Sequence, residues 1–371
     1  MSQMITKSFV AGFAIFSMLF GSGNIVFPLV LGKTCPDNWP LALFGWLIAA
    51  VLIPMIGYYG AMLFDADRKK YLSPIGKHAT SLIMFIIMML VGPFGVLARI
   101  VNVAFGGINN LAPEISIWLF SALFTAVTVA LAFHPGKIVQ LIGIVFTPLK
   151  FGGIAVIVLG ALYFGGSLSH FTENPLPPTE TLITGFNMGY QTMDLLASLI
   201  MAGEVYLYLK RAMPEADRDN KKKLLKFTGT ACLIGGIILS IAYIGLLLIG
   251  VQYSDRLSDT PAESILGKIA ELSMGYSASW FVSIVIAVSC MATAIILSSV
   301  FTDYIHDDVL KKKFDRKIIL VFVGIIMFAV SLLGFGQICS FLGMILEKIY
   351  PVLMLFIGGR IVYYYAVINK K

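Results

Sequence analysis

Charged residues are scarce in this chain, and cysteines are few. Asp, Glu, Lys and Arg make up 13% of the 371 residues, about half the share of a soluble globular domain. The four cysteines stand singly, which excludes a zinc cluster and a disulfide framework. Hydrophobic residues reach 58% and mean hydropathy is +0.89, more apolar surface than one water-soluble core can bury. The composition therefore predicts an all-α integral membrane protein.

Ten apolar stretches are long enough to cross a bilayer, which takes about 20 residues each. They are 9–31, 41–64, 81–106, 115–133, 137–164, 182–208, 227–252, 278–303, 317–334 and 338–366. With the N-terminus inside, 20 Lys and Arg residues fall on the inner side and three on the outer side. This bias predicts a multi-pass membrane protein with both termini in the cytoplasm. It assigns the basic loops to anionic lipid and not to nucleic acid.

The first apolar stretch is interrupted in its middle by Gly21, Ser22, Gly23 and Asn24. Unpaired backbone groups are costly in the hydrocarbon layer, so the interruption predicts two half-helices around an unwound joint that lines a cavity. Asn24 suits the N-cap of the second half-helix, and Pro28 falls in or just after its first turn. The three preceding amides then form a cradle for an anion such as a carboxylate. The alternative is a helix kink that allows close packing.

A second polar interruption lies in the sixth apolar stretch. It offers aromatic faces, freed carbonyls and polar side chains at Phe186, Tyr190, Gln191, Thr192 and Asp194. Aromatic faces can enclose an apolar substrate side chain, and freed carbonyls can accept a substrate ammonium. An acid inside the membrane is usually functional, although Asp194 at the start of a half-helix would also be stabilised by the helix dipole alone.

Interruptions in the first and sixth of ten spans are what an inverted repeat of five plus five helices produces. We expect residues 1–164 to form the first repeat and residues 165–371 the second, within one transmembrane domain. The binding site is expected at the interface of the repeats.

Other polar residues lie at the depth of the breaks. Lys150 is about midway in the fifth span, and Ser289 and Thr293 share one face of the eighth. Hydroxyls and unwound carbonyls are hard oxygen ligands that suit a cation such as sodium. The simpler reading is that each hydroxyl bonds within its own helix. Arg99 lies in the outer half of the third span, where Glu114 could pair with it.

Five motifs occur in order along the chain. They are Phe-Gly-Ser-Gly-Asn-Ile-Val-Phe-Pro at 20–28, Gly92-Pro93 followed by Arg99, Thr147-Pro148-Leu149, Gly-Tyr-Gln-Thr-Met-Asp at 189–194, and Tyr350-Pro351. Together they resemble the bacterial branched-chain amino acid:cation symporters, from about residue 12 to residue 355. The resemblance implies the leucine-transporter-type inverted-repeat fold with its first and sixth helices broken. It also implies sodium-driven uptake of leucine, isoleucine and valine.

The resemblance carries roles onto matching positions. Residues 21–23 would hold the substrate carboxylate, and Tyr190 and its neighbours would line the side-chain pocket. A cation would lie between carbonyls near Ser17 and Phe20 and the hydroxyl face of the eighth span. No cofactor is implied beyond a coupling ion, Na⁺ or H⁺.

The chain departs from the family pattern at three points. It ends after ten spans, where the family has twelve, and Ala292-Thr293 stands where the family has two threonines. Lys150 replaces a leucine, and its ammonium could occupy the place of the bound cation, with Thr293 as an acceptor. Certain sodium-independent amino acid transporters of this fold have such a lysine, so proton-coupled transport or exchange is the alternative function. In the other reading Lys150 pairs with Asp194 or another acid, and sodium still binds.

An integral-membrane enzyme is the main rival class. It would need catalytic groups at an interface, and only the acidic cluster at 303–308 offers them; a Lys triplet follows that cluster, which is typical of a solvated loop. The sequence therefore predicts a carrier and not an enzyme. It leaves open the preference among leucine, isoleucine, valine and methionine, and the oligomeric state.

Overall fold

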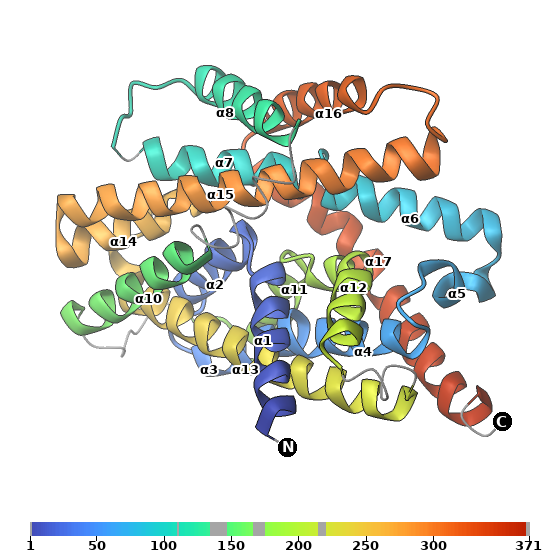
Figure 1. Ribbon diagram of the computed structural model, residues 1–371. Helices are drawn as coiled ribbons and strands as arrows, with labels where there is room; N and C mark the ends of the chain where they lie inside the picture. Colours follow the sequence, from blue (N-terminus) through green and yellow to red (C-terminus); the bar gives the residue numbers. More distant parts are fainter. Residues whose placement is uncertain (1, 110, 134–146, 166–174, 214–219, 369–371) are drawn as a thin grey trace.

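The computed structural model describes residues 2–109, 111–133, 147–165, 175–213 and 220–368 (Figure 1). Within these residues the regular secondary structure is all helical. The α-helices are α1 (Ser2–Leu19), α2 (Ser22–Thr34), α3 (Trp39–Leu47), α4 (Ile53–Leu63), α5 (Arg68–Leu72), α6 (Lys77–Val91), α7 (Val96–Asn109), α8 (Ile117–Ala132), α10 (Thr147–Phe164), α11 (Pro178–Tyr190), α12 (Asp194–Ala212), α13 (Lys221–Gln252), α14 (Ile265–Met274), α15 (Tyr276–Tyr304), α16 (Arg316–Ser331) and α17 (Phe335–Tyr363). Short 3₁₀ or π segments are η1 (Ile48–Leu52), η2 (Ser73–Ile75), η5 (Ser254–Arg256), η6 (Ala262–Ser264), η7 (Ile305–Val309) and η8 (Tyr364–Ile368).

Each of the ten predicted stretches contains at least one of these helices. Six helical stretches in the described residues are long and apolar enough to cross a membrane alone, and α1 with α2 makes a seventh if the bent pair is one span. Helices α8 and α10 are apolar but shorter. For the fifth stretch, residues 137–146 lie outside the described part.

The first predicted span is broken as expected. Helices α1 and α2 meet at an angle of 75° across Phe20 and Gly21. The sixth is also interrupted, between the end of α11 and the start of α12 at Asp194. The third span holds a break that the sequence did not predict, since α6 ends at Val91 and α7 begins at Val96.

Spans one, two, six and seven pack together as one group. Helices α1 and α2 pack against α13, α3 packs against α11, and α4 against α12. Glycines allow this close approach: a Cβ at Gly32 would lie 2.2 Å from the carbonyl oxygen of Leu247, and a Cβ at Gly45 would lie 2.3 Å from that of Leu182. Real atoms do not approach so closely, so the helices touch backbone to backbone at these positions.

A second group lies beside the first. Helix α15 packs against α7, α8 and α16, and α16 packs against α8; α8 and α16 form the outer layer at the top of Figure 1. Helix α10 links the groups through α13 and α15, and α17 contacts both α4 and α7. The two broken spans belong to the first group, and α2 also contacts α7 and α15 of the second group. The division of the chain at residues 164 and 165 stays a prediction.

Helix α14 was not predicted, because residues 253–277 read as an outer loop. Its buried apolar residues, Ile265, Leu266, Ile269 and Ala270, recur at helical spacing and pack it on α15 and α10.

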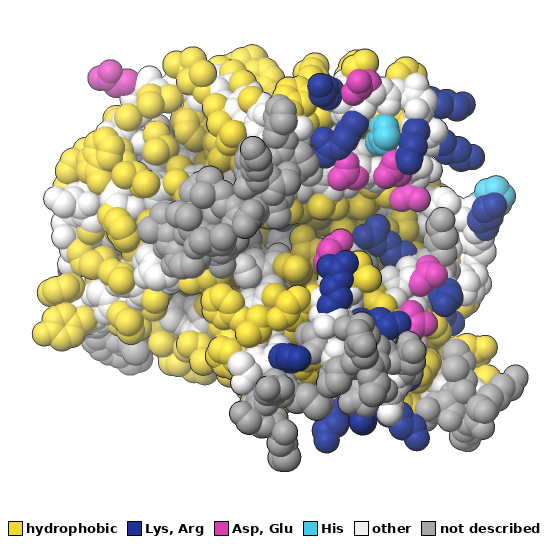
Figure 2. All heavy atoms as spheres, in the orientation of Figure 1, with side chains coloured by type: hydrophobic (Ala, Val, Ile, Leu, Met, Phe, Trp, Pro, Cys, Tyr) yellow, Lys and Arg dark blue, Asp and Glu magenta, His cyan; other side chains and the backbone are white. Residues whose placement is uncertain are grey.

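Large apolar side chains elsewhere face outward, among them Phe44, Leu123 and Leu159. Lys and Arg side chains gather at one end of the molecule, on the right in Figure 2. An apolar belt with a basic end is the surface of a protein embedded in a bilayer.

Candidate functional site

The break in the first span begins at Gly21. Its backbone is extended, with φ −98° and ψ −166°, and its amide donates to the side-chain oxygen of Asn24 at 3.0 Å. Helix α2 thus starts at Ser22, and Asn24 is its third residue and not the N-cap that the sequence predicted. The prediction failed because an asparagine oxygen can also reach back to the N-cap amide from inside the first turn.

This geometry leaves two backbone N–H donors and one backbone carbonyl acceptor without helical partners at the start of α2. The amides of Ser22 and Gly23 belong to the first turn, where a helix supplies no acceptors, so they can face an anion. The amide of Gly21, expected in the same cradle, is already bonded to Asn24. Pro28 lies inside the helix, deeper than predicted. Since proline has no N–H, the carbonyl of Asn24 lacks its bond to the following turn.

The break in the sixth span is built from Thr192 and Met193. The Thr192 hydroxyl donates to the Gly189 carbonyl at 2.9 Å, and the Asp194 amide donates to that hydroxyl at 3.4 Å. The backbone of Met193 is left-handed, with φ 58°, a conformation that is unfavourable for residues other than glycine. The chain pays this cost only where the surroundings fix the conformation, and such positions cluster at functional sites.

Asn24 and Asp194 join the two breaks directly. The Asn24 amide donates to a carboxylate oxygen of Asp194 at 2.7 Å and also to the hydroxyl of Tyr243. Tyr243, on α13, donates in turn to the same Asp194 oxygen at 3.1 Å. All three side chains are buried. This polar triangle ties α2, α12 and α13 together, and it fully occupies the Asn24 amide.

Aromatic rings lie near the second break. The Tyr190 ring is 4.9 Å from that of Phe186 and 4.4 Å from that of Tyr350, between ring centres. These faces suit an apolar substrate side chain. The indole nitrogen of Trp46 and the side-chain oxygen of Gln191 are buried with no hydrogen-bond partner among the described residues. Such atoms can bind the polar ends of an amino acid.

Arg99 is a site residue that the sequence did not identify. It is 2% exposed, and its guanidinium donates to the Gln191 carbonyl at 2.7 Å. The same group lies 5.5 Å from the centre of the Phe27 ring on α2. Glu114 is exposed, and within the described residues no carboxylate pairs with Arg99, so the predicted pair is wrong. Arg99 instead holds the second break beside α2.

The residues predicted to bind a cation are distributed over three helices. Thr293 on α15 donates to the Ser289 carbonyl at 3.0 Å, the intrahelical bond of the simpler reading. Ser17 lies on α1, and Phe20 is the first residue after the end of α1, at the break. Helix α1 packs mainly against α12 and α13, and α15 mainly against α7 and α14. The structure therefore shows no assembled cation cage among these described residues, and the cation site stays a prediction.

Lys150 lies on α10, but its side chain is outside the described residues. The next residue, Phe151, packs its ring 4.4 Å from that of Phe16 and 5.7 Å from that of Phe20. Helix α10 thus reaches the broken end of α1 beside Lys150.

Tyr243 and the contacts of Arg99 were both missed for the same reason. Each of the two residues is a polar group within an apolar run, and hydropathy places such a residue at a depth without showing which neighbour it faces. The acidic cluster at 303–308 lies on the surface, where Asp303 accepts a bond from Arg316 at 2.6 Å.

A family model described as branched-chain amino acid transport protein matches residues 4–369. The chain is 26% identical over 364 residues to the branched-chain amino acid permease BrnQ of Bacillus subtilis, covering 95% of this chain and 80% of that protein. It is 26% identical over 356 residues to the BrnQ permease of Escherichia coli, covering 94% and 79%.

The fold is similar to that of Mhp1 in its inward-facing conformation. The TM-score is 0.70 at 14% identity, with 98% of this chain and 77% of that chain covered. At that identity the likeness shows the fold alone, which is the leucine-transporter type. The curated relatives are permeases, so this is a multi-pass membrane transporter and not an enzyme. Because the family model matches nearly its whole length, the chain belongs to the branched-chain amino acid transport protein family.

Proposed function

We propose that this protein imports leucine, isoleucine and valine across the bacterial cytoplasmic membrane by symport with a cation, Na⁺. Both termini lie in the cytoplasm in this proposal, as the distribution of Lys and Arg indicates. The observation that supports it best is the hydrogen bond between Asn24 and Asp194, which places the breaks of the first and sixth spans side by side. Paired broken helices at mid-membrane depth are the form of a transporter substrate site.

The substrate is held by its two charged ends. Its carboxylate lies at the first turn of α2, against the amides of Ser22 and Gly23 and the positive end of the helix dipole. Its ammonium donates to unwound carbonyls, among which the carbonyl of Asn24 is freed by Pro28. The aliphatic side chain packs toward Tyr190 and Phe186.

Alternating access uses the bend between α1 and α2. The two helices differ by 75° in direction, and α2 is anchored on α13 by the close contact of Gly32 with Leu247. Helix α1 packs on α13 as well, so a change of its angle at Gly21 would have to shift α1 along α13 while α2 keeps the substrate site intact.

A second coupling mechanism rests on the position of α10. Phe151 packs on Phe16 and Phe20, so Lys150 is next to the joint where the coupling cation is expected. An ammonium there would replace sodium, and transport would be driven by protons or would be an exchange.

Leucine uptake by the purified protein in proteoliposomes tests both mechanisms. An inward sodium gradient at equal pH on both sides should drive accumulation of labelled leucine, and a proton gradient without sodium should not. Accumulation driven only by protons would contradict sodium symport and favour the Lys150 mechanism. The Lys150→Leu variant distinguishes the two mechanisms further. If Lys150 takes the place of the cation, this variant should lose the pH dependence of leucine uptake or gain sodium dependence. Counterflow without accumulation under either gradient would identify an exchanger.

A further inference from the structure

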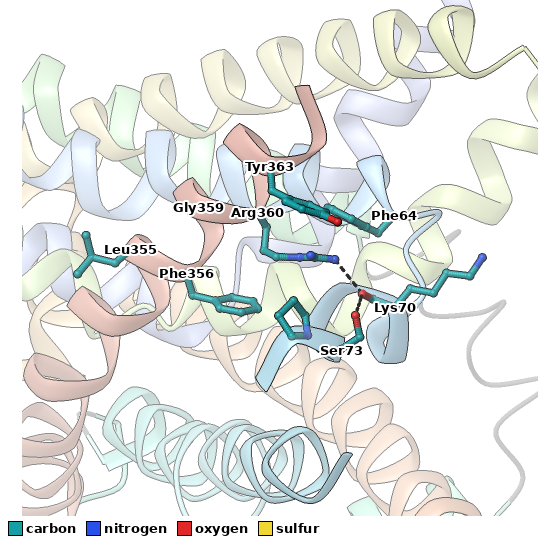
Figure 3. Close-up of a pocket in the computed structure, with 9 residues that line it drawn as sticks. Phe64, Lys70, Ser73, Leu355, Phe356, Gly359, Arg360 and Tyr363 are labelled. Carbon is teal, nitrogen blue, oxygen red and sulfur yellow. Dashed lines mark hydrogen bonds between the residues drawn. The ribbon is translucent and has the colours of Figure 1, made fainter. Parts of the chain in front are cut away.

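An open cavity of about 920 Å³ lies away from the two breaks, between the end of α4, the short helix α5 and the last turns of α17 (Figure 3). Its walls are mostly apolar, with Phe64 on one side, Pro74 on another, and Leu355 and Phe356 along α17. Arg360 and Lys70 are its charged residues. The size is within the range of about 300–1,000 Å³ of small-ligand sites.

Arg360 is a fixed positive charge at one end of this cavity. Its side chain is held by the Phe64 ring, whose centre lies 3.8 Å from the guanidinium carbon, and by a bond of 2.9 Å from its Nη2 to the Lys70 carbonyl. Figure 3 shows the guanidinium between Phe64 and Tyr363 on one side and Ser73 and Lys70 on the other. Arg360 is only 7% exposed. A buried arginine is costly unless an anion or several acceptors match its charge.

The protein matches that charge with aromatic rings and not with an anion: the ring centres of Phe64, Tyr363 and Tyr71 lie 3.8, 5.5 and 6.0 Å from the guanidinium carbon. Among the described residues no carboxylate pairs with Arg360, and its Nε has no hydrogen-bond partner. Among the described residues, the Lys70 carbonyl is the one hydrogen-bond acceptor of Arg360. That carbonyl also accepts a hydrogen bond of 2.9 Å from the Ser73 hydroxyl. The side chain of Lys70 leads away from the cavity in Figure 3 and is 63% exposed, with a loose 3.7 Å contact to Asp65. Turning this side chain into the cavity would break only its exposed contact with Asp65 and would add a second positive charge.

The other end of the cavity faces lipid. Leu355 lines the cavity and is 78% exposed, and Val352 and Val362 on the same helix are 65% and 67% exposed. Exposed apolar side chains on a membrane helix contact acyl chains. The cavity thus runs from a cation to a lipid-facing surface, and it adjoins the loop between the second and third spans, which carries Arg68 and three lysines. That is the depth at which lipid headgroups lie.

We propose that this cavity binds one anionic glycerophospholipid of the leaflet on the basic side of the protein. The phosphodiester accepts hydrogen bonds from the Arg360 guanidinium and, when its side chain turns, from the Lys70 ammonium. The upper part of an acyl chain lies along Leu355 and Phe356. A free phosphate would use the cationic end but would leave the apolar wall bare, so a lipid is the better match. The lipid would join the second span to the tenth, independently of the transport mechanism proposed above.

Native mass spectrometry of the full chain, released from detergent micelles doped with lipid, measures this binding. Dioleoylphosphatidylglycerol should be retained about tenfold more tightly than dioleoylphosphatidylcholine, because one or two charge contacts near the membrane surface are each worth about a five- to tenfold change. Equal retention of the two lipids would overturn the proposal. So would displacement of phosphatidylglycerol by millimolar inorganic phosphate, which would assign the site to a free anion.

Two neighbouring glycines provide a matched pair of variants. Gly359 lines the cavity and Gly358 does not, yet a Cβ at either would meet nothing within 4 Å. Gly359→Leu should fill the cavity and weaken phosphatidylglycerol binding at least about tenfold, while Gly358→Leu should change it less than about twofold. Both changes favour the helix equally, so stability does not separate them. Equal effects of the two variants would contradict the assignment of the site.

Charge removal tests the cationic end. Arg360→Gln should abolish the preference for phosphatidylglycerol over phosphatidylcholine, and Lys70→Gln should reduce it about fivefold or less. Lys77→Gln is the control, since Lys77 is an exposed residue at the start of α6 and does not line the cavity. If Arg360→Gln does not fold, the Gly359→Leu result decides the proposal alone. An unchanged lipid preference in folded Arg360→Gln would overturn it.

Discussion

Asn24 and Asp194 are 170 residues apart in the sequence and share a buried hydrogen bond of 2.7 Å. Each stands within three residues of a break in a membrane-spanning helix. The contact therefore fixes the start of α2 against the start of α12. Any movement that separates the two half-helices must break this bond, and any movement that carries them together leaves the substrate site intact.

The coupling between these two residues can be measured with a double-mutant cycle. Asn24→Ala and Asp194→Ala should each reduce leucine uptake and the thermal stability of the purified protein. The double variant should be little worse than the more damaged single variant, because their shared bond can be lost only once. A coupling of about 1–3 kcal/mol is expected for a buried bond to a carboxylate.

Asn102 provides the control for that cycle. It is a second buried asparagine, bonded to the carbonyls of Ala98 and Ser331 and not to the polar triangle. Asn102→Ala combined with Asp194→Ala should have additive effects. Additive effects for the pair of Asn24 and Asp194 as well would show that their bond carries no coupling.

Gly21→Ala tests the carboxylate cradle. The backbone at Gly21 is extended and has room, with a Cβ meeting no atom closer than 3.5 Å, so the fold should tolerate alanine. The added methyl would lie beside the first-turn amides and should raise the KM for leucine about tenfold, with expression unchanged. Gly336→Ala, at an exposed position with open space, should leave KM unchanged. An unchanged KM in Gly21→Ala would place the carboxylate elsewhere.

The sequence predicted the architecture well and the contacts poorly, for a physical reason. The length of each apolar stretch predicts a span, and glycine with polar residues inside such a stretch predicts a break. The reason is that unpaired backbone groups are tolerated in the bilayer only where they line a cavity or are buried in protein. Depth along the membrane can thus be read from residue order. The direction in which a side chain points depends on helix rotation and packing, which residue order does not give. Asn24 and Asp194 were predicted at the same level and do meet in the structure, whereas Tyr243 and the partner of Arg99 were not found.

Helix α14 and the N-cap of α2 show two further limits. Helix α14 is amphipathic and lies in a segment too polar to be read as a span, so a search for apolar length passes over it. The predicted N-cap was wrong because an asparagine oxygen can accept from a free helix amide in two ways, from the N-cap position or from within the first turn. Only the backbone at Gly21 decides between them.

Arg99 is expected to act as a positioning residue for the second break. Arg99→Lys keeps a positive charge but cannot both stack on Phe27 and donate to the Gln191 carbonyl in the same way. It should raise the KM for leucine at least about fivefold, and Arg99→Gln should raise it further. The matched control is Arg68→Lys, since Arg68 also donates to a carbonyl, that of Ile200 at 2.6 Å, outside the site. A purely structural role for Arg99 would instead lower the amount of folded protein and leave KM unchanged.

Gly32→Ala should destabilise the bundle. Its new Cβ would lie 2.2 Å from the Leu247 carbonyl oxygen and 2.8 Å from the Val251 amide nitrogen, so α2 and α13 must move apart. Overpacking of this kind costs about 1–3 kcal/mol. The melting temperature in detergent should fall by several degrees, while Gly203→Ala in α12, where a Cβ meets nothing within 4 Å, should leave it the same or higher. Equal melting temperatures for the two variants would show that the helices do not approach so closely.

The central claim is that the two breaks together form a site for branched-chain amino acids, and equilibrium binding tests it most directly. Labelled leucine should bind the purified protein saturably, with unlabelled isoleucine and valine competing and arginine failing to compete. The Asn24→Ala and Asp194→Ala variants, folded by the criterion of a single melting transition, should each lose at least about tenfold in affinity. Wild-type affinity in both variants, or displacement of leucine by arginine as readily as by valine, would contradict the account.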